Sequence, residues 1–579
     1  MKIDKQKFLN VIPYLIFLAS TFITILPQIN SASVIMGPDT RFHFARFFDT
    51  AMQLKTGIFS YFQTNFAFQQ SGRVINAAYG PFFAYLNGLL VLLCGSWVKY
   101  QIVSDFIISF VGAACMYHLC NCVKVNRVIG ILISVIYVNI GMIPTYINGS
   151  AFNGWGQALM PLVVLCGIRM IGNPEKPIDY LQLMLVISIL AQIHLLSTLF
   201  AIGLLIPFFL ISTFYNCKKK IFWDNLFKAI IGSIILTANV WGGLLTLKLE
   251  NNLSTPSPFN LSLHQLSLLG YVQGDNYYWG SVNSNILPLL FLMVIAELCF
   301  VIFYFKKELI IATCTILGTL VLLITSVYFP WDKLQMKYLV LQRVLQFPYR
   351  LLVVAYPLIL ISGALIIQHY FNSNKIFRPF LVTFLVLLSI EAIVPSILNN
   401  NYFVEKSINK EFVQREANST DISKFVCNHI YGNLPDYLPM KEKAKNNSKL
   451  GFIYKAKVGK KYRRYKHHVL KDGTLVLKWK KKKKIVAVPV IAYHQSQVKF
   501  NGKVFHGRKN KIGMPIIKSK KGINKLSIKF IVPVWFKVLN ILSIITWLGI
   551  ICFEIYHCLK NILKARQLRG QKLISSLIS

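Results

Sequence analysis

Long apolar segments separated by short polar ones run through almost the whole chain. A transmembrane helix needs about 17 to 25 mostly apolar residues, and twelve segments come near this length. They lie at residues 8–28, 103–120, 128–145, 158–172, 180–196, 198–215, 226–246, 286–305, 309–329, 350–370, 379–397 and 534–555. With 55% hydrophobic and 15% charged residues among 579, the chain is too apolar for a soluble multidomain protein. The sequence predicts a polytopic α-helical membrane protein whose first segment is retained rather than cleaved.

The basic residues of the short loops predict the orientation of these segments, because such residues stay in the cytoplasm. A cytoplasmic N-terminus places every basic short loop inside, provided that the short apolar run 81–95 does not cross. We therefore expect this run to form a juxtamembrane or re-entrant helix on the outer side, and both termini to be cytoplasmic. The outer side of the cell membrane then receives residues 29–102, 146–157, 247–285, 330–349 and 398–533.

One polar region supplies more than half of the net charge of +42. Residues 398–532 contain 32 Lys and Arg against seven Asp and Glu. Such a charge commonly indicates a nucleic-acid partner. In a chain that is inserted in the bilayer, we instead expect anionic lipid headgroups or an anionic cell-envelope polymer, and no nucleic acid.

The same region has the pattern of a β-rich domain. Alternating or β-branched runs predict strands at residues 474–479, 485–490, 498–500, 503–505 and 526–532, and Asn501-Gly502 is a strong two-residue hairpin signal. We expect a small sandwich or jelly-roll at 398–533, between a transmembrane module at 1–397 and a final helix with a basic tail at 534–579. The lysine-rich run 478–484 fits either a polyanion-binding surface or a solvated edge strand.

The best candidate for chemistry follows the first apolar segment. A helix beginning after Pro38 would carry Asp39, His43, Arg46 and two further polar residues, Thr50 and Gln53, in one stripe. Phenylalanines would occupy its other faces. We expect this helix to lie on the membrane surface, with its aromatic side chains in lipid and its charged groups, Arg41 among them, turned to water. A simple loop anchor would have the same composition.

Other polar residues in the outer loops are candidates for substrate binding. Gln346 follows Arg343 and precedes Arg350 just before an apolar segment, where two arginines could clamp a phosphate or only snorkel to the interface. His194 falls at a break between two segments, as a functional residue or as a packing residue. Gln157 ends an amide- and glycine-rich loop that suits either a sugar or a tight turn.

No phosphate-binding glycine loop, H-E-x-x-H or G-x-S-x-G motif occurs in a fitting context. ATP-driven pumping and serine or zinc hydrolysis therefore lose most of their support. A lipid-borne substrate at the outer face of the membrane is the better expectation.

The order of these motifs resembles the GT-C superfamily of membrane glycosyltransferases, which use polyprenyl-phosphate sugars. It is most similar to the bacterial YfhO-like proteins and to the set labelled "6-pyruvoyl-tetrahydropterin synthase-related". The resemblance rests on Asp39-Thr40 with His43 and Arg46, on Tyr79-Gly80-Pro81, on His194 with Ser197-Thr198, on 346–350 and on the C-terminal 488–502. The chain has Gly80 where relatives often have a second proline, and Gln157 where they often have glutamate.

The resemblance implies that Asp39 is catalytic, as a general base or as the partner of a metal, with the lipid-phosphate donor beside it. A carboxylate can take the proton of an acceptor hydroxyl, and Arg41, Arg46, Arg343 and Arg350 could stabilise the departing phosphate. His43, Gln157, His194 and Gln346 would complete substrate binding. The cofactor is unknown, with a divalent cation left open.

We expect a glycosyltransferase that moves a sugar from a polyprenyl phosphate to a teichoic acid, glycolipid or polysaccharide. A flippase for lipid-linked glycans is a second possibility, and it would need charged residues in mid-span and an internal repeat. A third is a non-catalytic envelope-assembly protein in which the β-rich domain is the working part.

Overall fold

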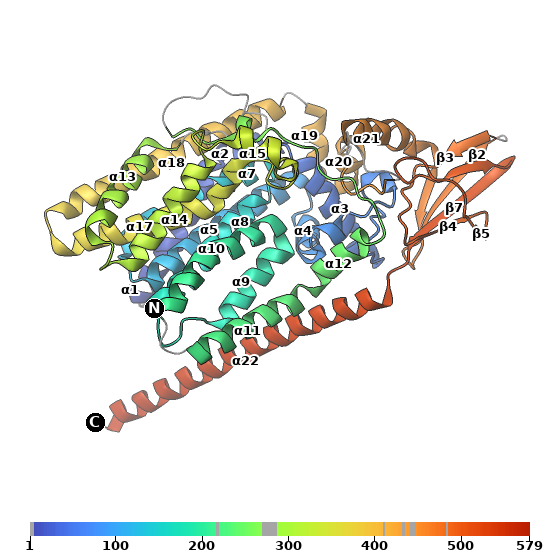
Figure 1. Ribbon diagram of the computed structural model, residues 1–579. Helices are drawn as coiled ribbons and strands as arrows, with labels where there is room; N and C mark the ends of the chain where they lie inside the picture. The colour runs from blue at the N-terminus through green and yellow to red at the C-terminus, as the bar shows by residue number, and fades with distance from the viewer. Residues whose placement is uncertain are drawn as a thin grey trace.

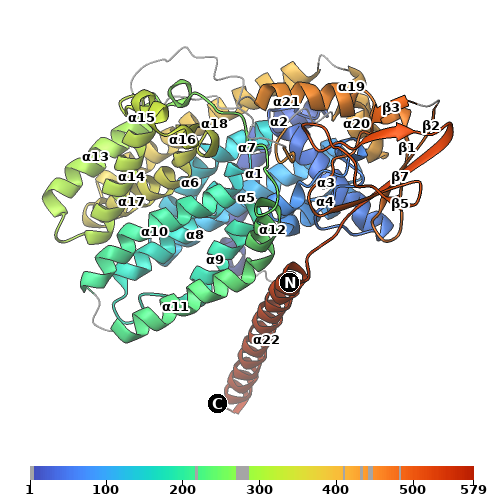
Figure 2. The same cartoon turned by 45° about the vertical axis from the view of Figure 1, so that its right-hand side comes forward.

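A computed structural model gives the structure of the protein and describes residues 5–215, 219–268, 286–408, 411–430, 435–440, 447–481 and 484–578. A large bundle of α-helices forms most of the molecule, and a β-stranded region lies at one end of it (Figures 1 and 2). The last helix, α22, runs along the side of the bundle against α11 and α12.

The helices of the first half are α1 (Lys5–Thr24), α2 (Leu26–Ser31), α3 (Thr40–Thr56), α4 (Pro81–Cys94), α5 (Trp97–Cys122), α6 (Arg127–Val138), α7 (Met142–Gly149), α8 (Asn153–Gly172), α9 (Tyr180–Ile193), α10 (Leu195–Tyr215), α11 (Lys219–Leu236) and α12 (Ala238–Lys248). Those of the second half are α13 (Pro288–Tyr304), α14 (Leu309–Thr325), α15 (Trp331–Lys337), α16 (Leu339–Val344), α17 (Leu352–Ser373), α18 (Phe377–Ile408), α19 (Glu411–Ala417), α20 (Ile422–His429), α21 (Asn447–Tyr454) and α22 (Val534–Ile578).

A helix occupies each of the predicted apolar segments, but fewer than twelve are long enough to cross a membrane. Among the described residues, six helices have the required length and composition, and two bent pairs, α6 with α7 and α11 with α12, raise this to eight if each pair is one span. Helices α1, α4, α9, α13 and α14 are apolar but shorter. The structure is thus consistent with a membrane protein, and twelve spans stay a prediction.

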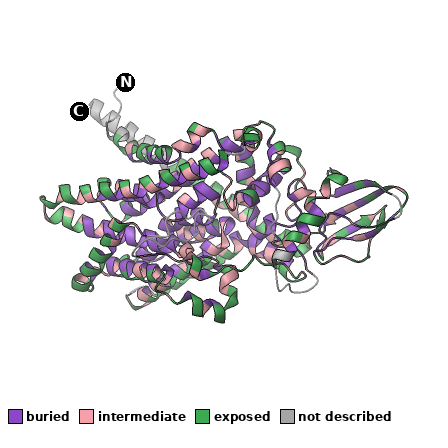
Figure 3. Ribbon diagram, turned by 90° about the horizontal axis from the view of Figure 1, so that it is seen from above, coloured by how far each residue is buried: buried purple, intermediate pink, exposed green. Residues whose placement is uncertain are grey.

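The middle of the bundle is buried, and the outward faces of its peripheral helices are exposed and apolar (Figure 3). On α10 and α13, the exposed fraction is 86% for Phe214 and 80% for Phe303. Exposed apolar surface of this extent on a soluble molecule would be an aggregation risk. It is the surface expected where helices meet lipid chains.

Helix α3 begins after Pro38 as predicted, but its aromatic side chains are not free to enter lipid, and most of its polar stripe does not face water. Phe44 and Phe47 are 1% exposed, and so is Arg46 on the polar side. The helix packs against α4 and α20, so both its aromatic and its polar faces are covered by protein. The amphipathic pattern gave the right helix and the wrong surroundings, because polar partners from other segments cover the charged stripe.

The β-stranded region forms two small antiparallel sheets. The larger has the order β1-β2-β7-β4-β5 and the smaller pairs β3 with β6. The strands are β1 (Lys466–Val469), β2 (Leu475–Lys481), β3 (Lys484–Ala487), β4 (Ser496–Phe500), β5 (Lys503–Val504), β6 (Ile516–Ser519) and β7 (Gly522–Phe530).

Most of these strands were predicted, whereas β1 and β6 were not. Asn501 and Gly502 form the expected two-residue hairpin between β4 and β5, and both have positive φ, at 47° and 88°. In the lysine-rich run 478–484, only Lys478 lies between two strands, whereas Trp479–Lys481 pair with β7 alone, as an edge segment does. Over Leu475–Lys478, strand β2 lies between β1 and β7.

A polar loop of the helical part ties the two regions together. The side-chain amide of Asn65 donates to the carbonyl of Gly473 at 2.9 Å, and the Ile491 amide donates to the carbonyl of Ser71 at 2.7 Å. Phe62 stacks on Phe530 of β7, with ring centroids 4.5 Å apart. The β-stranded region is therefore fixed on the end of the bundle that carries α3 and α4.

We predict that Gly88→Ala destabilises the protein, because Gly88 of α4 lies directly against Thr50 and Ala51 of α3 and leaves no room for a side chain. A Cβ at residue 88 would lie 2.4 Å from Thr50 Oγ1 and 2.7 Å from the Ala51 amide nitrogen. Overpacking of this kind costs about 1 to 3 kcal/mol. The measurement is the thermal unfolding midpoint in detergent.

The matched control is Gly203→Ala in α10, where a Cβ would meet no atom within 4 Å. This change should leave the midpoint unchanged or raise it, because alanine is about 1 kcal/mol more favourable than glycine inside a helix. Equal midpoints for the two variants would contradict the close packing of α3 on α4.

Candidate functional site

Asp39 lies immediately before α3, at the end of the bundle that carries the β strands. Its amide donates to the carbonyl of Gly149 at 3.1 Å, which fixes it against the end of α7. Its side chain lines a small cavity together with Asn153, Tyr349 and Arg350. The cavity has a volume of about 20 Å³, which is room for a single water molecule. The predicted catalytic acid therefore does reach a cavity, and that cavity is small, with Asp39 itself partly exposed.

Arg46 and His43 form the interior part of the polar stripe. The guanidinium of Arg46 contacts His43 Nδ1 at 3.1 Å, and its Nε donates to Asn76 Oδ1 at 3.1 Å. Its Cζ lies 4.5 Å from the ring centre of Tyr79, and the His43 ring stacks on Phe152 at 4.0 Å. A buried arginine needs this kind of satisfaction by hydrogen bonds and aromatic faces.

These contacts fix the state of His43. An arginine side chain has only donors, so Nδ1 of His43 accepts and its other nitrogen carries the proton. Burial, followed by the charges of Arg46 and His194, lowers the pKa of His43 well below its ordinary value. His43 is therefore a neutral imidazole at physiological pH.

His194 and Arg350 approach the site from two further segments. His194 ends α9, and its Nδ1 lies 2.8 Å from Ser197 Oγ at the start of α10. Burial, with the charges of Arg350 and Arg46, lowers the pKa of His194 to about 3. Arg350 donates to the Leu345 carbonyl at 3.1 Å and lies over the Phe347 ring. The site thus combines two neutral imidazoles with two arginines.

A second carboxylate, which the sequence analysis missed, comes from the segment before the β strands. Asp436 is held by its backbone, whose carbonyl accepts from Arg73 Nη2 at 2.6 Å. The neighbouring Tyr437 has a positive φ of 61°, and its carbonyl accepts from the Tyr493 hydroxyl at 2.8 Å. Ser254 pairs with this segment through the Tyr437 amide and the Leu438 amide. The Asp436 segment is therefore clamped from both regions of the molecule.

The charge of Asp436 acts on Asp39. Burial raises the pKa of Asp39 to about 6, the charge of Arg350 opposes this rise, and the charge of Asp436 adds to it. Burial likewise raises the pKa of Asp436 to about 6, against the opposing charge of Arg73. A carboxyl with such a pKa is ionised at neutral pH and binds a proton more readily than an ordinary aspartate.

Three other predicted site residues, Arg41, Arg343 and Gln346, do not line the cavity. Arg41 is exposed on α3 and Arg343 is half-buried on α16. Gln346 has a positive φ of 61°, and its amide donates to the Leu341 carbonyl, so it shapes the turn before Arg350. Arg350, and not Arg343, is the arginine whose charge acts on Asp39.

Gln157 is fully buried, and its side chain is engaged by backbone. Its Nε2 donates to the carbonyls of Tyr137 and Ile140 at 3.1 and 2.8 Å, and its Oε1 accepts from the Met142 amide at 2.5 Å. These bonds hold the break between α6 and α7. Both amide hydrogens of Gln157 are thus already taken, and its role in substrate binding stays a prediction.

The lower part of the stripe supports α3 rather than the cavity. Thr50 Oγ1 donates to the Ala84 carbonyl of α4 at 2.7 Å. Gln53 donates to Asp49, and Asp49 Oδ1 accepts from the amides of Phe66 and Ala67 at 2.8 and 3.2 Å. The sequence analysis did not single out Asp49, because it lies off the stripe.

Few side chains near Asp39 could act as metal ligands. Among the described residues, no three His, Cys, Asp or Glu side chains lie together in a group that could hold a metal ion. A cation at Asp39 would therefore take most of its ligands from substrate and water. The arginines and neutral imidazoles could serve an anionic substrate, and Asp39 could serve as a base, without one.

Comparison with known proteins adds no assignment: no family model matches the chain, and no curated protein matches it. The geometry of the site therefore carries the functional argument.

We predict that Asp39 and Asp436 each contribute a loss of thermal stability as pH rises from about 4 to about 7, whereas the lowered pKa values of His43 and His194 contribute a gain over the same range. Asp39 and Asp436 have a raised pKa in the folded protein, so between the unfolded and folded pKa values the folded state binds more protons, and stability is lost as they ionise. Relative to the unchanged protein, Asp39→Asn and Asp436→Asn should therefore each gain midpoint as pH rises through this range, because each variant lacks one of the two contributions that fall. The measurement is the unfolding midpoint in detergent across that pH range.

Asp421→Asn is the control. Asp421 is exposed, and hydrogen bonding to Ser423 lowers its pKa, so it titrates below the tested range and its removal should leave the slope unchanged. A pH dependence that both site variants retain in full would show that neither carboxyl has the raised pKa.

Proposed function

We propose that the protein is a membrane glycosyltransferase of the GT-C type, which transfers a sugar from a polyprenyl phosphate to a cell-envelope acceptor. The observation that carries this proposal is one small cavity lined by both Asp39 and Arg350. Within the proposal, the chain has twelve spans, both termini are cytoplasmic, and the β-stranded region is an extracytoplasmic sandwich. The site then faces the outer leaflet.

The chemistry of the cavity fits such a transfer. A general base works best with a pKa near the working pH, and burial has already moved the pKa of Asp39 to about 6. Asp39 takes the proton of the acceptor hydroxyl, the oxygen attacks the anomeric carbon, and the bond to the lipid phosphate breaks. Arg350 and Arg46 stabilise the negative charge that grows on the phosphate.

Asp436 has a positioning role in this proposal. Its charge raises the pKa of Asp39, and its segment joins the β-stranded region to the site through Arg73. A cavity of about 20 Å³ is too small for a sugar, so substrate entry requires that one wall moves. The walls come from the segments before α3 and α17 and from the ends of α7 and α8.

A row of lysines on the larger sheet supports an anionic acceptor. Lys466 of β1 lies opposite Lys478 of β2, which lies opposite Lys525 of β7, and all three are exposed. Adjacent strands are about 4.8 Å apart, and like charges directly opposite each other are destabilising. A chain of phosphates along this row would remove the repulsion.

The two alternatives have weaker support. The buried carboxylate Glu297 in α13 is the feature that a flippase for lipid-linked glycans would use. A non-catalytic assembly protein would need the β-stranded region and not Asp39.

We predict that Asp39→Asn abolishes transfer while the protein remains folded. A positioned base contributes about 100-fold or more to rate. The test is to delete the gene in its native host, complement with each variant, and measure the sugar composition of wall-polymer and glycolipid fractions at matched protein levels.

Arg41→Ala is the matched control, because Arg41 is exposed on the same helix and should complement. Arg350→Ala should fail like Asp39→Asn. Normal envelope glycosylation with Asp39→Asn would refute catalysis by this residue, and no glycan difference on gene deletion would refute the proposed function.

We also predict that the lysine row binds a polyphosphate. The triple change of Lys466, Lys478 and Lys525 to Gln should weaken binding of soluble wall teichoic acid, measured by calorimetry on the purified protein. Binding by the unchanged protein should weaken as salt rises, because screening shortens the reach of surface charge. The same triple change among exposed lysines elsewhere, Lys424, Lys460 and Lys537, should have a smaller effect, and equal effects would refute a specific row.

A further inference from the structure

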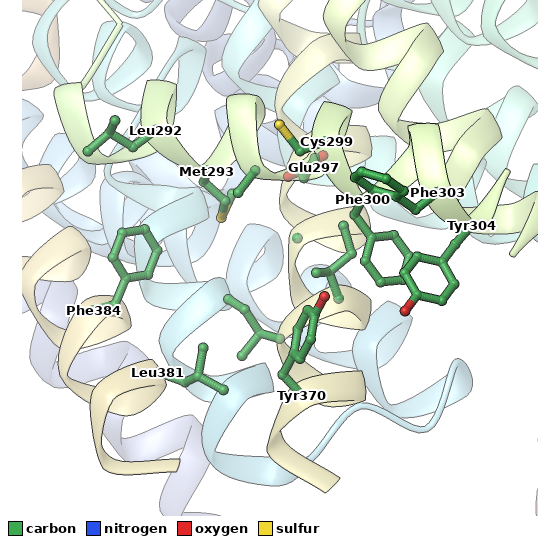
Figure 4. Close-up of a pocket in the computed structure, with 14 residues that line it drawn as sticks. Leu292, Met293, Glu297, Cys299, Phe300, Phe303, Tyr304, Tyr370, Leu381 and Phe384 are labelled. Carbon is green, nitrogen blue, oxygen red and sulfur yellow. The ribbon is translucent and has the colours of Figure 1, made fainter. Parts of the chain in front are cut away.

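A second cavity lies away from the Asp39 site, among the apolar helices α13, α17 and α18 (Figure 4). It has a volume of about 510 Å³, within the usual range of sites for small ligands. Met293 and Phe300 of α13, Tyr370 of α17 and Phe384 of α18 are among its lining residues. Leu292 and Phe303 at its rim are 55% and 80% exposed, so the cavity opens onto the apolar surface of the bundle.

One acidic side chain faces this otherwise apolar cavity. Glu297 is 1% exposed, and Figure 4 shows it between Met293 and Phe300 on the α13 side. Its Oε2 accepts from the hydroxyls of Ser362 and Thr315, the latter at 3.2 Å. Its Oε1 is buried and has no hydrogen-bond partner.

The backbone of α17 leaves space for this free oxygen. A Cβ at Gly363 would lie 2.8 Å from Glu297 Oε1, so only glycine allows the carboxyl its position. Leaving a buried polar atom unpaired is energetically unfavourable. A bound group that pairs with Oε1 would recover this energy.

The position of Glu297 near the middle of α13 restricts the chemistry of a ligand that could pair with its Oε1. Glu297 is the tenth of the 17 residues of α13, roughly 10 to 14 Å from either end of the helix at 1.5 Å per residue. Bringing a charged amine or phosphate so deep among apolar helices is costly. A hydroxyl is less costly to bury, and it can either donate to or accept from a carboxyl oxygen, whichever oxygen carries a proton.

We propose that this cavity binds a long-chain lipid alcohol. The alkyl chain would lie against the aromatic and aliphatic side chains of α13, α17 and α18, and the hydroxyl would pair with Glu297 Oε1. The site is separate from the proposed catalytic cavity and does not depend on glycosyl transfer.

The test uses the full-length protein in lipid nanodiscs and two photoreactive probes, a hexadecanol and a hexadecane that each carry a mid-chain diazirine. After illumination, mass spectrometry maps the labelled peptides. We expect the alcohol to label α13, α17 and α18 more than the alkane, by about three- to tenfold, since one hydrogen bond contributes about 0.5 to 1.5 kcal/mol. In Glu297→Leu, the two probes should label equally.

A second pair of variants tests the location independently of the acid. Ala296→Trp would fill the cavity from its exposed wall residue and should remove labelling by the alcohol, whereas Ile295→Trp, an exposed neighbour that does not line the cavity, should leave it unchanged. Labelling that survives Ala296→Trp would overturn the site. Equal labelling of the unchanged protein by both probes would overturn its chemistry and leave a purely apolar chain as the occupant.

Discussion

The burial of a charged helix face is the constraint on which the candidate site depends. Arg46 is 1% exposed inside the protein, where an unpaired guanidinium would be prohibitively costly. The structure satisfies it with a neutral imidazole, an amide oxygen and the faces of aromatic rings. Each of these partners comes from α3 itself or from a segment folded over it. The polar stripe of α3 therefore dictates what must pack around it.

The same constraint explains why the site is assembled from distant parts of the chain. The end of α7 contacts Asp39, the break between α9 and α10 supplies His194, and the turn before α17 supplies Arg350. Each is a place where a helix ends or bends and leaves polar groups that need partners. These ends lie close enough that the charges of Arg350 and Arg46 act on His194, and Asp39 and Arg350 line the same cavity.

The sequence predicted those parts of the structure that depend on local pattern. The helix after Pro38, the hairpin at Asn501-Gly502 and the helices in the apolar segments follow from periodicity and turn chemistry. The surroundings of α3 could not be predicted in this way, because a stripe of polar residues has the same spacing whether it meets water or buried partners. Asp436 was missed for a related reason: a single acid in a basic region has no local signature, and its importance comes from Arg73 and Asp39, which are far away in the chain.

Asp436 comes from the segment that precedes the β strands, and this affects which experiments can distinguish a glycosyltransferase, a flippase and an assembly protein. The β-stranded region and the helical part meet through the Arg73 contact and through the Asn65 contact, so the acid that tunes Asp39 is held in place by both. Removing residues 400–530 would take away Asp436 together with the lysine row, and a catalytic site and a polymer-binding surface would fail at once. Single-residue substitutions can test the catalytic site and the polymer-binding surface separately. The lysine row lies on the exposed face of the larger sheet, whereas Asp436 lies in the clamped segment that precedes the β strands. A protein whose activity depends on Asp39 and Asp436 but tolerates loss of the lysines is an enzyme with a dispensable acceptor surface, and the reverse pattern describes an assembly protein.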